Sequence, residues 1–201
     1  MGRIFYVMGK SSSGKDTIFE ELINRDELGL KNIILYTTRP IRAKETDGVQ
    51  YHFVDEEKLH EFERADRIIE MRAYHTVQGI WKYATVDDGQ IDLERHDYLA
   101  IGTLVSYEKL QEYFGADMLV PIYIEVSDDN RLERALKRER KQANPDYEEM
   151  CRRFLADSRD FSEENIRKAQ IEKRFCNDGD REICIEEAAS YIKHIKGLVL
   201  L

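Results

Sequence analysis

The sequence predicts a three-layer α/β fold with a parallel central sheet. Apolar segments that suit buried strands alternate along the chain with segments of helical periodicity, which is the pattern of a parallel sheet covered by helices. The first apolar segment, residues 4–8, runs directly into a loop of glycine and serine and then into a helical segment. At 201 residues, the chain is long enough for one substantial core with a small inserted subdomain.

The predicted elements can be placed in chain order. In the first half we expect strands at residues 3–8, 32–36, 51–54 and 67–74, and helices at 15–24 and 55–64, the second capped by Asp55. In the second half we expect strands at 81–85, 98–103, 118–126 and 173–176, and helices at 106–114, 129–141, 145–160 and 181–196. Between residues 75 and 93, only the strand at 81–85 and a turn at 87–89 are predicted.

Residues 9–16 read Gly-Lys-Ser-Ser-Ser-Gly-Lys-Asp, the pattern of a phosphate-binding loop with one letter changed. The glycines let backbone amides turn inward around phosphate oxygens, Lys15 adds a mobile cation, and the following helix presents its positive N-terminal end. The pattern normally ends in a Ser or Thr that binds Mg²⁺, but here Asp16 stands at that position and Thr17 comes one residue too late. We therefore predict that a nucleoside triphosphate contacts Gly9, Ser11, Ser12, Ser13, Gly14, Lys15, Asp16 and Thr17.

Composition argues against several classes of function. Forty acidic and 31 basic residues give a net charge of −9, which does not suit a general nucleic-acid-binding surface. The three cysteines have neither metal-ligand spacing nor the number expected of a disulfide framework. No charged leader and no apolar run near the ~20 residues of a membrane span are present. We expect a cytoplasmic monomer or homodimer that binds neither nucleic acid nor membrane.

A second block of residues carries more specific information. Residues 36–42 read Tyr-Thr-Thr-Arg-Pro-Ile-Arg, and Glu45, Asp47-Gly48 and Tyr51-His52-Phe53 follow. This block resembles the guanylate kinase family, which carries Thr-Thr-Arg, a second arginine three residues on, a glutamate, a glycine turn and Tyr-x-Phe. The resemblance implies a P-loop kinase fold with a parallel central sheet, a small inserted nucleotide-binding lobe and a helical lid.

The resemblance also divides the chain. It implies a single domain over residues 1–201, with a core formed by about residues 1–36, 98–130 and 160–201. The monophosphate-binding lobe would span about residues 37–90, and the lid about residues 131–159.

The acceptor site implied by the resemblance begins with Arg39, Arg42 and Tyr51. Two guanidinium groups and a phenol from one loop make a fork for a phosphate monoester, because arginine offers paired donors matched to phosphate oxygens. Glu70 looks like the family's glutamate that faces guanine, where a carboxylate accepts two adjacent N–H groups that adenine lacks. The alternative is that Glu70 is an exposed strand carboxylate.

The family's next element, a Tyr-Gly-Thr turn, has its nearest match in residues 83–85, about four residues late. An insertion at about residues 75–80 would explain the delay. Tyr83 would then reach the phosphate and Thr85 the base.

The basic segment after residue 130 resembles the family's two-helix lid over the ATP phosphates, although the family's Arg-Gly-Thr is missing. In-line phosphoryl transfer needs positive groups around oxygens that carry charge in the transition state. Lys15 and the lid residues Arg138, Arg140 and Arg153 are therefore the candidate catalytic residues. Asn177 resembles a family residue close to the adenine pocket, and a simple turn is the alternative there.

The strand at residues 99–102, Leu-Ala-Ile-Gly, lacks both aspartates of the corresponding family strand. Asp16 could supply the lost carboxylate to Mg²⁺ bound with ATP, or it could simply favour the positive start of the helix. A ribose bisphosphate kinase branch of the same superfamily also resembles Gly-Lys-Asp at this point.

The favoured function is transfer of the ATP γ-phosphate to GMP or dGMP, with ATP, a nucleoside monophosphate and Mg²⁺ as ligands. Three alternatives stay open at this point. They are a kinase of the same fold that acts on a ribose phosphate or another nucleotide, a non-catalytic guanylate-kinase-like module that binds phosphorylated partners, and a regulatory nucleotide-binding switch.

Overall fold

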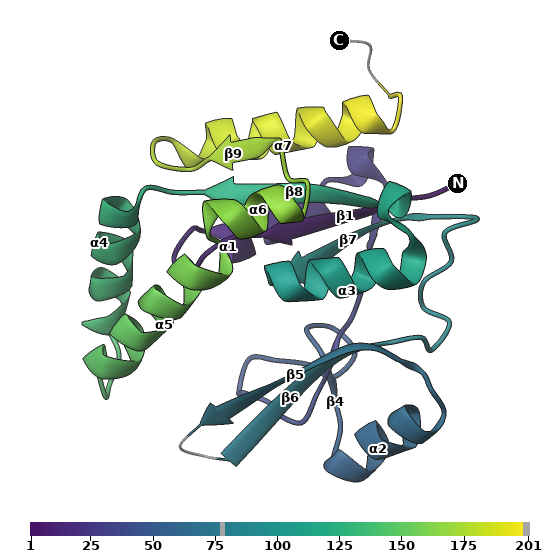
Figure 1. The fold of residues 1–201 in the computed structure, drawn as a ribbon, viewed down its shortest axis with the longest axis horizontal. Coiled ribbons are helices and arrows are strands. Elements are labelled where there is room, and N and C mark those ends of the chain that lie inside the picture. The colour runs from purple at the N-terminus through teal and green to yellow at the C-terminus, as the bar shows by residue number, and fades with distance from the viewer. Residues whose placement is uncertain (77–78, 199–201) are drawn as a thin grey trace.

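A five-stranded parallel sheet forms the centre of the molecule (Figure 1). The structure is a computed structural model that describes residues 1–76 and 79–198. The strands lie in the order β2-β7-β1-β8-β9. Their bounds are β1 Ile4–Met8, β2 Leu30–Asn32, β7 Asp97–Gly102, β8 Leu119–Glu125 and β9 Arg174–Cys176. All pairings between them are parallel, as the alternation of strands and helices predicted.

Helices cover both faces of this sheet. In the buried central strand β1, Ile4, Tyr6 and Met8 join one apolar cluster, while Phe5 and Val7 join the other, because alternate side chains point to opposite faces. The first cluster includes residues of α3 (Leu104–Phe114) and α6 (Glu163–Lys168), and the second includes residues of α1 (Lys15–Ile23) and α7 (Arg181–Ile195). The predicted three-layer arrangement is therefore confirmed.

A second, mixed sheet lies beside the core and carries the order β4-β3-β6-β5. Its strands are β3 Tyr36–Thr37, β4 His52–Phe53, β5 Ile68–Thr76 and β6 Gly79–Val86. Helix α2 (Glu56–Arg64) packs Leu59 and Phe62 against one face of it, with Asp55 as the predicted N-cap. We refer to residues 36–86 as the lobe. Figure 1 shows it as a separate layer below the central sheet.

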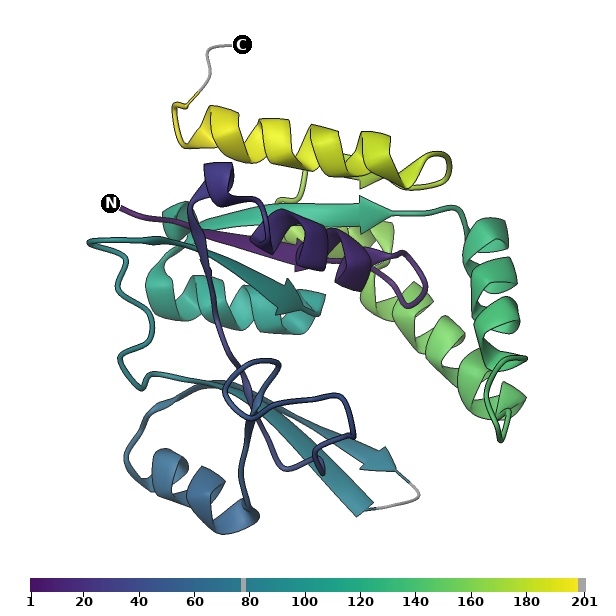
Figure 2. The same ribbon diagram turned by 180° about the vertical axis from the view of Figure 1, so that it is seen from behind.

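Two helices, α4 (Asp128–Glu139) and α5 (Tyr147–Asp160), stand at the end of the sheet toward which β8 points (Figures 1 and 2). We refer to them as the helix pair. Short 3₁₀ turns, η1 (Asp26–Leu28) and η2 (Ala116–Met118), precede β2 and β8. Within the described part of the chain, no helix has the length and apolar character that crossing a membrane requires.

The predicted strand at residues 32–36 is wrong, because this segment passes from one sheet to the other. Its first residue closes β2, and its last opens β3 in the lobe. The buried Ile33 still packs in the core, while Tyr36 packs against Phe62 of α2, with ring centroids 5.0 Å apart. Both ends of the crossing are therefore apolar, which makes the segment look like one strand.

Other differences are smaller. The predicted helix at 106–114 begins two residues earlier, because the Thr103 side chain caps it by accepting from Ser106 N–H. The strand at 81–85 extends to Gly79–Val86 and pairs with β5. Part of the predicted insertion, residues 77–78, lies outside the described residues. The six-residue helix α6 was not predicted.

Candidate active site

The glycine-serine loop connects β1 to α1 and depends on its two glycines. A Cβ on the buried Gly9 would lie 2.6 Å from the backbone oxygen of Ile124 in β8. Gly14 has φ +86°, in the left-handed region that favours glycine, and a Cβ there would lie 2.6 Å from Asn177 Nδ2. A larger residue at either position would therefore clash with β8 or with Asn177.

Asn177, just after β9, braces this loop from the other end of the chain. Its Nδ2 donates a 2.7 Å hydrogen bond to the Ser13 backbone oxygen, and its own backbone oxygen accepts one from Arg134 Nη2 at 2.7 Å. Asn177 Oδ1 and the hydroxyls of Ser12 and Ser13 are buried and have no hydrogen-bond partner within the described residues. Buried polar atoms normally find partners, so these atoms are available to a polar ligand.

Lys15 and Asp16 begin α1, and Thr17 follows half-buried on the same helix. Lys15 Nζ lies 3.1 Å from Asp16 Oδ2, and the Asp16 side chain is 78% exposed. Among the described residues, no group of three His, Cys, Asp or Glu side chains could hold a metal ion. Mg²⁺ on a nucleotide usually keeps several waters and takes only one or two protein carboxylates. Asp16 thus fits a single protein ligand for a metal that arrives with the triphosphate.

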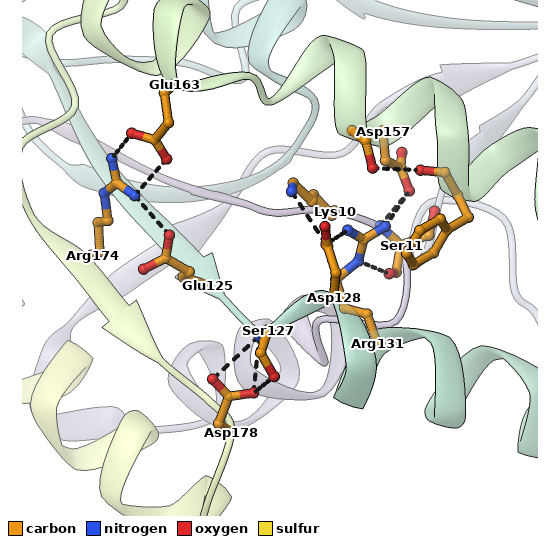
Figure 3. A network of polar contacts seen from close by, with 12 residues as sticks. Lys10, Ser11, Glu125, Ser127, Asp128, Arg131, Asp157, Glu163, Arg174 and Asp178 are labelled. Atoms are coloured by element: carbon orange, nitrogen blue, oxygen red, sulfur yellow. Dashed lines mark hydrogen bonds and ion pairs between the residues drawn. The ribbon is translucent and has the colours of Figure 1, made fainter.

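The helix pair contacts the loop directly (Figure 3). Asp157 Oδ2 accepts a 2.7 Å hydrogen bond from Ser11 N–H, and Arg131 Nε donates a 3.2 Å bond to the Ser11 oxygen. The fully buried Arg131 also pairs with Asp128 at 2.5 Å and lies over the Phe154 ring, 4.3 Å from its centroid. Sequence reasoning missed these residues, because Arg131 looked like one more charge in a basic segment.

Beside these contacts, a cavity of about 150 Å³ lies between the helix pair and the loop. Ser11 and Ser12 line it on one side, and Arg138 of α4 and Arg153 of α5 on the other. Arg140, by contrast, is the C-cap residue of α4 and does not line the cavity. The structure therefore brings two of the three predicted lid arginines to the phosphate loop.

Arg39 lies at the centre of the second motif. It is 4% exposed and forms a two-pronged ion pair with Glu45, with N–O distances of 2.9 and 2.7 Å. This pairing raises the pKa of Arg39. The guanidinium also lies over the rings of Tyr51 and Phe53, 5.3 and 5.4 Å from their centroids. Glu45 accepts a further bond from the backbone N–H of Arg42, whose side chain is exposed. Glu45 thus fixes the loop that presents both arginines.

Tyr51 connects the two motifs. Burial raises the pKa of its phenol, the nearby Tyr83 adds to this, and Arg39 opposes it. Asp16 of the phosphate loop also raises this pKa, so it lies within electrostatic reach of Tyr51. The Tyr51 and Tyr83 rings meet edge to face with centroids 5.6 Å apart. The Tyr51 phenol is therefore influenced by charges from both motifs.

Glu70 and Thr85 are cross-strand partners in β5 and β6. Both are buried, and Thr85 Oγ1 donates a 3.0 Å hydrogen bond to Glu70 Oε1. The alternative that Glu70 is an exposed carboxylate is wrong. Sequence reasoning missed Arg72, which follows Glu70 on the same face of the strand. Arg72 Nε lies 3.1 Å from Glu70 Oε2, and its Nη2 donates a 3.4 Å bond to Oε1.

The end of β7 explains why this chain has no acid at residue 102. A Cβ on Gly102 would overlap the hydroxyl of Tyr6, which is held in the core beside Ser106. Burial raises the pKa of that phenol, which therefore stays neutral. The Tyr6 side chain fills the space that an aspartate side chain would need at this strand end.

The parallel sheet, the glycine loop that opens α1 and the lobe facing it define the class of P-loop kinases. The family model described as guanylate kinase matches residues 1–166. The chain therefore belongs to the guanylate kinase family.

Known proteins agree with this assignment. The guanylate kinase of Malacoplasma penetrans (strain HF-2) is 26% identical over 204 residues, which cover 96% of this chain and 92% of that protein. The guanylate kinase of Mycoplasma pneumoniae (strain ATCC 29342 / M129 / Subtype 1) is 36% identical over 74 residues, 37% of this chain and 31% of that protein. The crystal structure of guanylate kinase from Anaplasma phagocytophilum has the same fold, with a TM-score of 0.62 and 21% identity over 96% of this chain and 86% of that chain.

Proposed function

We propose that this protein transfers the γ-phosphoryl group of ATP to GMP or dGMP, giving ADP and GDP or dGDP. Family membership supports the reaction class. The observation that carries the proposal is that the chain combines a glycine loop at the start of α1 with a buried Arg39 that Glu45 holds over the Tyr51 ring. This arrangement suits a donor and an acceptor phosphate that meet between the core and the lobe.

On the donor side, residues 9–17 hold the ATP phosphates through backbone amides, and Asn177 keeps the loop in place beside the nucleotide. Lys15 and the two arginines that line the loop cavity, Arg138 and Arg153, stabilise charge on the moving phosphoryl group. They are better placed than Arg140, which does not line this cavity. Mg²⁺, when bound with ATP, neutralises the β- and γ-phosphates, and Asp16 is the residue that would hold it.

On the acceptor side, Arg39, Arg42, Tyr51 and Tyr83 bind the monophosphate. Arg39 is pre-positioned by Glu45, so little side-chain entropy is lost when it grips phosphate. Glu70 and Thr85 form the end of the site that meets the base. Closure of the helix pair and the lobe over both ligands would exclude water that could hydrolyse ATP.

We propose further that the protein acts in the cytoplasm as a monomer or homodimer, without nucleic acid or membrane. The net charge of −9 does not suit a general nucleic-acid-binding surface. Light scattering during gel filtration would measure the oligomeric state, and a mass above that of a dimer would contradict it.

The reaction is tested with Mg-ATP and a panel of GMP, dGMP, AMP, CMP, UMP and ribose bisphosphate, with ADP release as the measurement. We expect turnover with GMP and dGMP. Turnover confined to another acceptor would refute the guanine assignment. ATP binding without turnover on any acceptor would indicate a binding module instead.

One observation keeps a second candidate in the test. The phosphate loop ends in Gly-Lys-Asp, and Tyr6 fills the space beside Gly102 where the family has an aspartate. Both features depart from the family pattern, so the panel of acceptors must include ribose bisphosphate.

A further inference from the structure

The helix pair holds both backbone groups of one residue of the phosphate loop. Ser11 N–H donates a 2.7 Å hydrogen bond to Asp157 in the last turn of α5, and the Ser11 oxygen accepts a 3.2 Å bond from Arg131 in the first turn of α4 (Figure 3). The two holding side chains also attract each other, because Arg131 Nη2 lies 3.9 Å from Asp157 Oδ2. We refer to this arrangement, Arg131 and Asp157 on the backbone of Ser11, as the clamp.

Arg131 is an unusual residue for this position, because its guanidinium is fully buried. Burying a charge costs free energy that ion pairing offsets only in part, so apolar packing would hold two helices together at least as well. The guanidinium adds direction to the contact. Its Nε bonds to the loop, its Nη1 bonds to Asp128 at the start of α4, and its carbon lies 4.3 Å from the centroid of the Phe154 ring of α5. One side chain therefore fixes the loop, α4 and α5 relative to one another.

The clamp lies on the same helix faces as the two arginines that line the cavity beside the loop. Arg138 follows Arg131 two turns later on α4, and Arg153 precedes Asp157 by one turn on α5, so each pair lies on one side of its helix. At 1.5 Å per residue, Arg138 lies about 10 Å and Arg153 about 6 Å along its helix from the clamp residue. The position of the clamp therefore determines where both guanidinium groups can reach.

We propose that Arg131 and Asp157 are positioning residues, which hold Arg138 and Arg153 over the phosphate loop through the backbone of Ser11. This inference rests on the proposed phosphoryl transfer and on the roles given there to Arg138 and Arg153. A misplacement of about 1 Å can slow catalysis roughly a hundredfold, so a fixed base for the helix pair matters most for turnover. Neither Arg131 nor Asp157 needs to contact a substrate for this role.

Two substitutions of Asp157 test the clamp. Asp157→Asn keeps an oxygen that accepts from Ser11 N–H, whereas Asp157→Leu has a similar volume and no acceptor. At saturating ATP and GMP, we expect kcat to stay within about threefold in Asp157→Asn and to fall roughly tenfold or more in Asp157→Leu. Arg152→Lys, at a side chain that is 63% exposed on α5, is the control and should leave kcat unchanged. A fall of the same size in both Asp157 variants, or in neither, would overturn the proposal.

A double-variant cycle gives the second test. Arg131→Lys keeps the charge but cannot bond to Ser11 and Asp128 from separate nitrogens. We expect Arg138→Met to lower kcat roughly tenfold in the unmodified protein but less than about threefold in the Arg131→Lys protein, because a guanidinium that is already misplaced contributes little.

Equal falls in both proteins would overturn the role of Arg131, since a loss of stability alone leaves the two changes independent. An unchanged kcat in Arg138→Met would refute the role of Arg138 and, with it, its positioning by Arg131. An unmodified protein that does not phosphorylate GMP would instead refute the proposed function.

Discussion

The carboxylate of Asp157 accepts a 2.7 Å hydrogen bond from the backbone N–H of Ser11, so one amide of the phosphate loop is engaged by the helix pair before any nucleotide binds. The Asp157 side chain is 20% exposed and lies 3.9 Å from Arg131. A negative charge is therefore fixed beside the place where the triphosphate is proposed to bind. The contact joins the helix pair to the loop and opposes the approach of phosphate.

Asp157→Asn should bind ATP several-fold more tightly, because the amide oxygen can still accept from Ser11 while the repelling charge is gone. Titration calorimetry with ATP measures the affinity. Glu148→Gln, an exposed residue on the first turn of the same helix, is the control and should change little. Weaker ATP binding in Asp157→Asn would show that the carboxylate supports the nucleotide instead.

Gly102→Ala should lower the free energy of unfolding by about 1–3 kcal/mol, because the added methyl group overlaps the Tyr6 hydroxyl. Tyr6→Phe removes the atom in conflict, so the double variant should lose less stability than the sum of the two single changes. Urea denaturation of all four proteins measures this coupling. Simple additivity would mean that the strand end relaxes in another way.

Asp16→Ser tests the proposed metal ligand. If Asp16 holds Mg²⁺, the variant should need several-fold more Mg²⁺ for half-maximal ADP release, since a hydroxyl is a weaker ligand than a carboxylate. Glu20→Gln, exposed on the same helix, should leave the Mg²⁺ requirement unchanged. An unchanged requirement and turnover in Asp16→Ser would leave Asp16 only its ion pair with Lys15 and its place at the helix start.

Cys184 provides a prediction about pH. Burial raises the pKa of its thiol to about 12, whereas Cys151 and Cys176 are exposed. We expect native protein at pH 8 to react with iodoacetamide at two cysteines, and at Cys184 only after unfolding. The unfolded thiol ionises near pH ~8.5, so stability from the buried neutral thiol is complete below that pH and is lost as pH rises toward the folded value. Cys184→Ala should remove this part of the alkaline loss, and rapid native labelling of Cys184 would contradict its burial.

Local motifs could be recognised from the sequence, because the residues that act together are neighbours in the chain. The loop at residues 9–16 and the segment from Arg39 to Tyr51 each carry their own turns and charges. Arg72 could not be found in this way. It pairs with Glu70, which also accepts a bond from Thr85 in the next strand, and it lies near Gly102 of the other sheet. No local pattern reports such neighbours.

The misplaced strand at residues 32–36 has a related cause. Periodicity shows that Ile33 and Tyr36 turn away from solvent, but not that Ile33 packs in the core while the partly buried Tyr36 packs in the lobe. Helix α6 was missed because six residues give less than two turns of pattern, even with Ser162 as its cap. The sequence pattern thus predicted which residues are buried, but not which strand or helix each of them packs against.

The hydrogen bond from Asn177 to Ser13 spans 164 residues, and this separation matters while the chain is being made. At roughly 5–20 residues per second, the ribosome adds Asn177 roughly 8–33 seconds after Ser13. Throughout that interval the nascent loop lacks the amide that braces it. A growing chain therefore cannot form this contact until its final strand has been made.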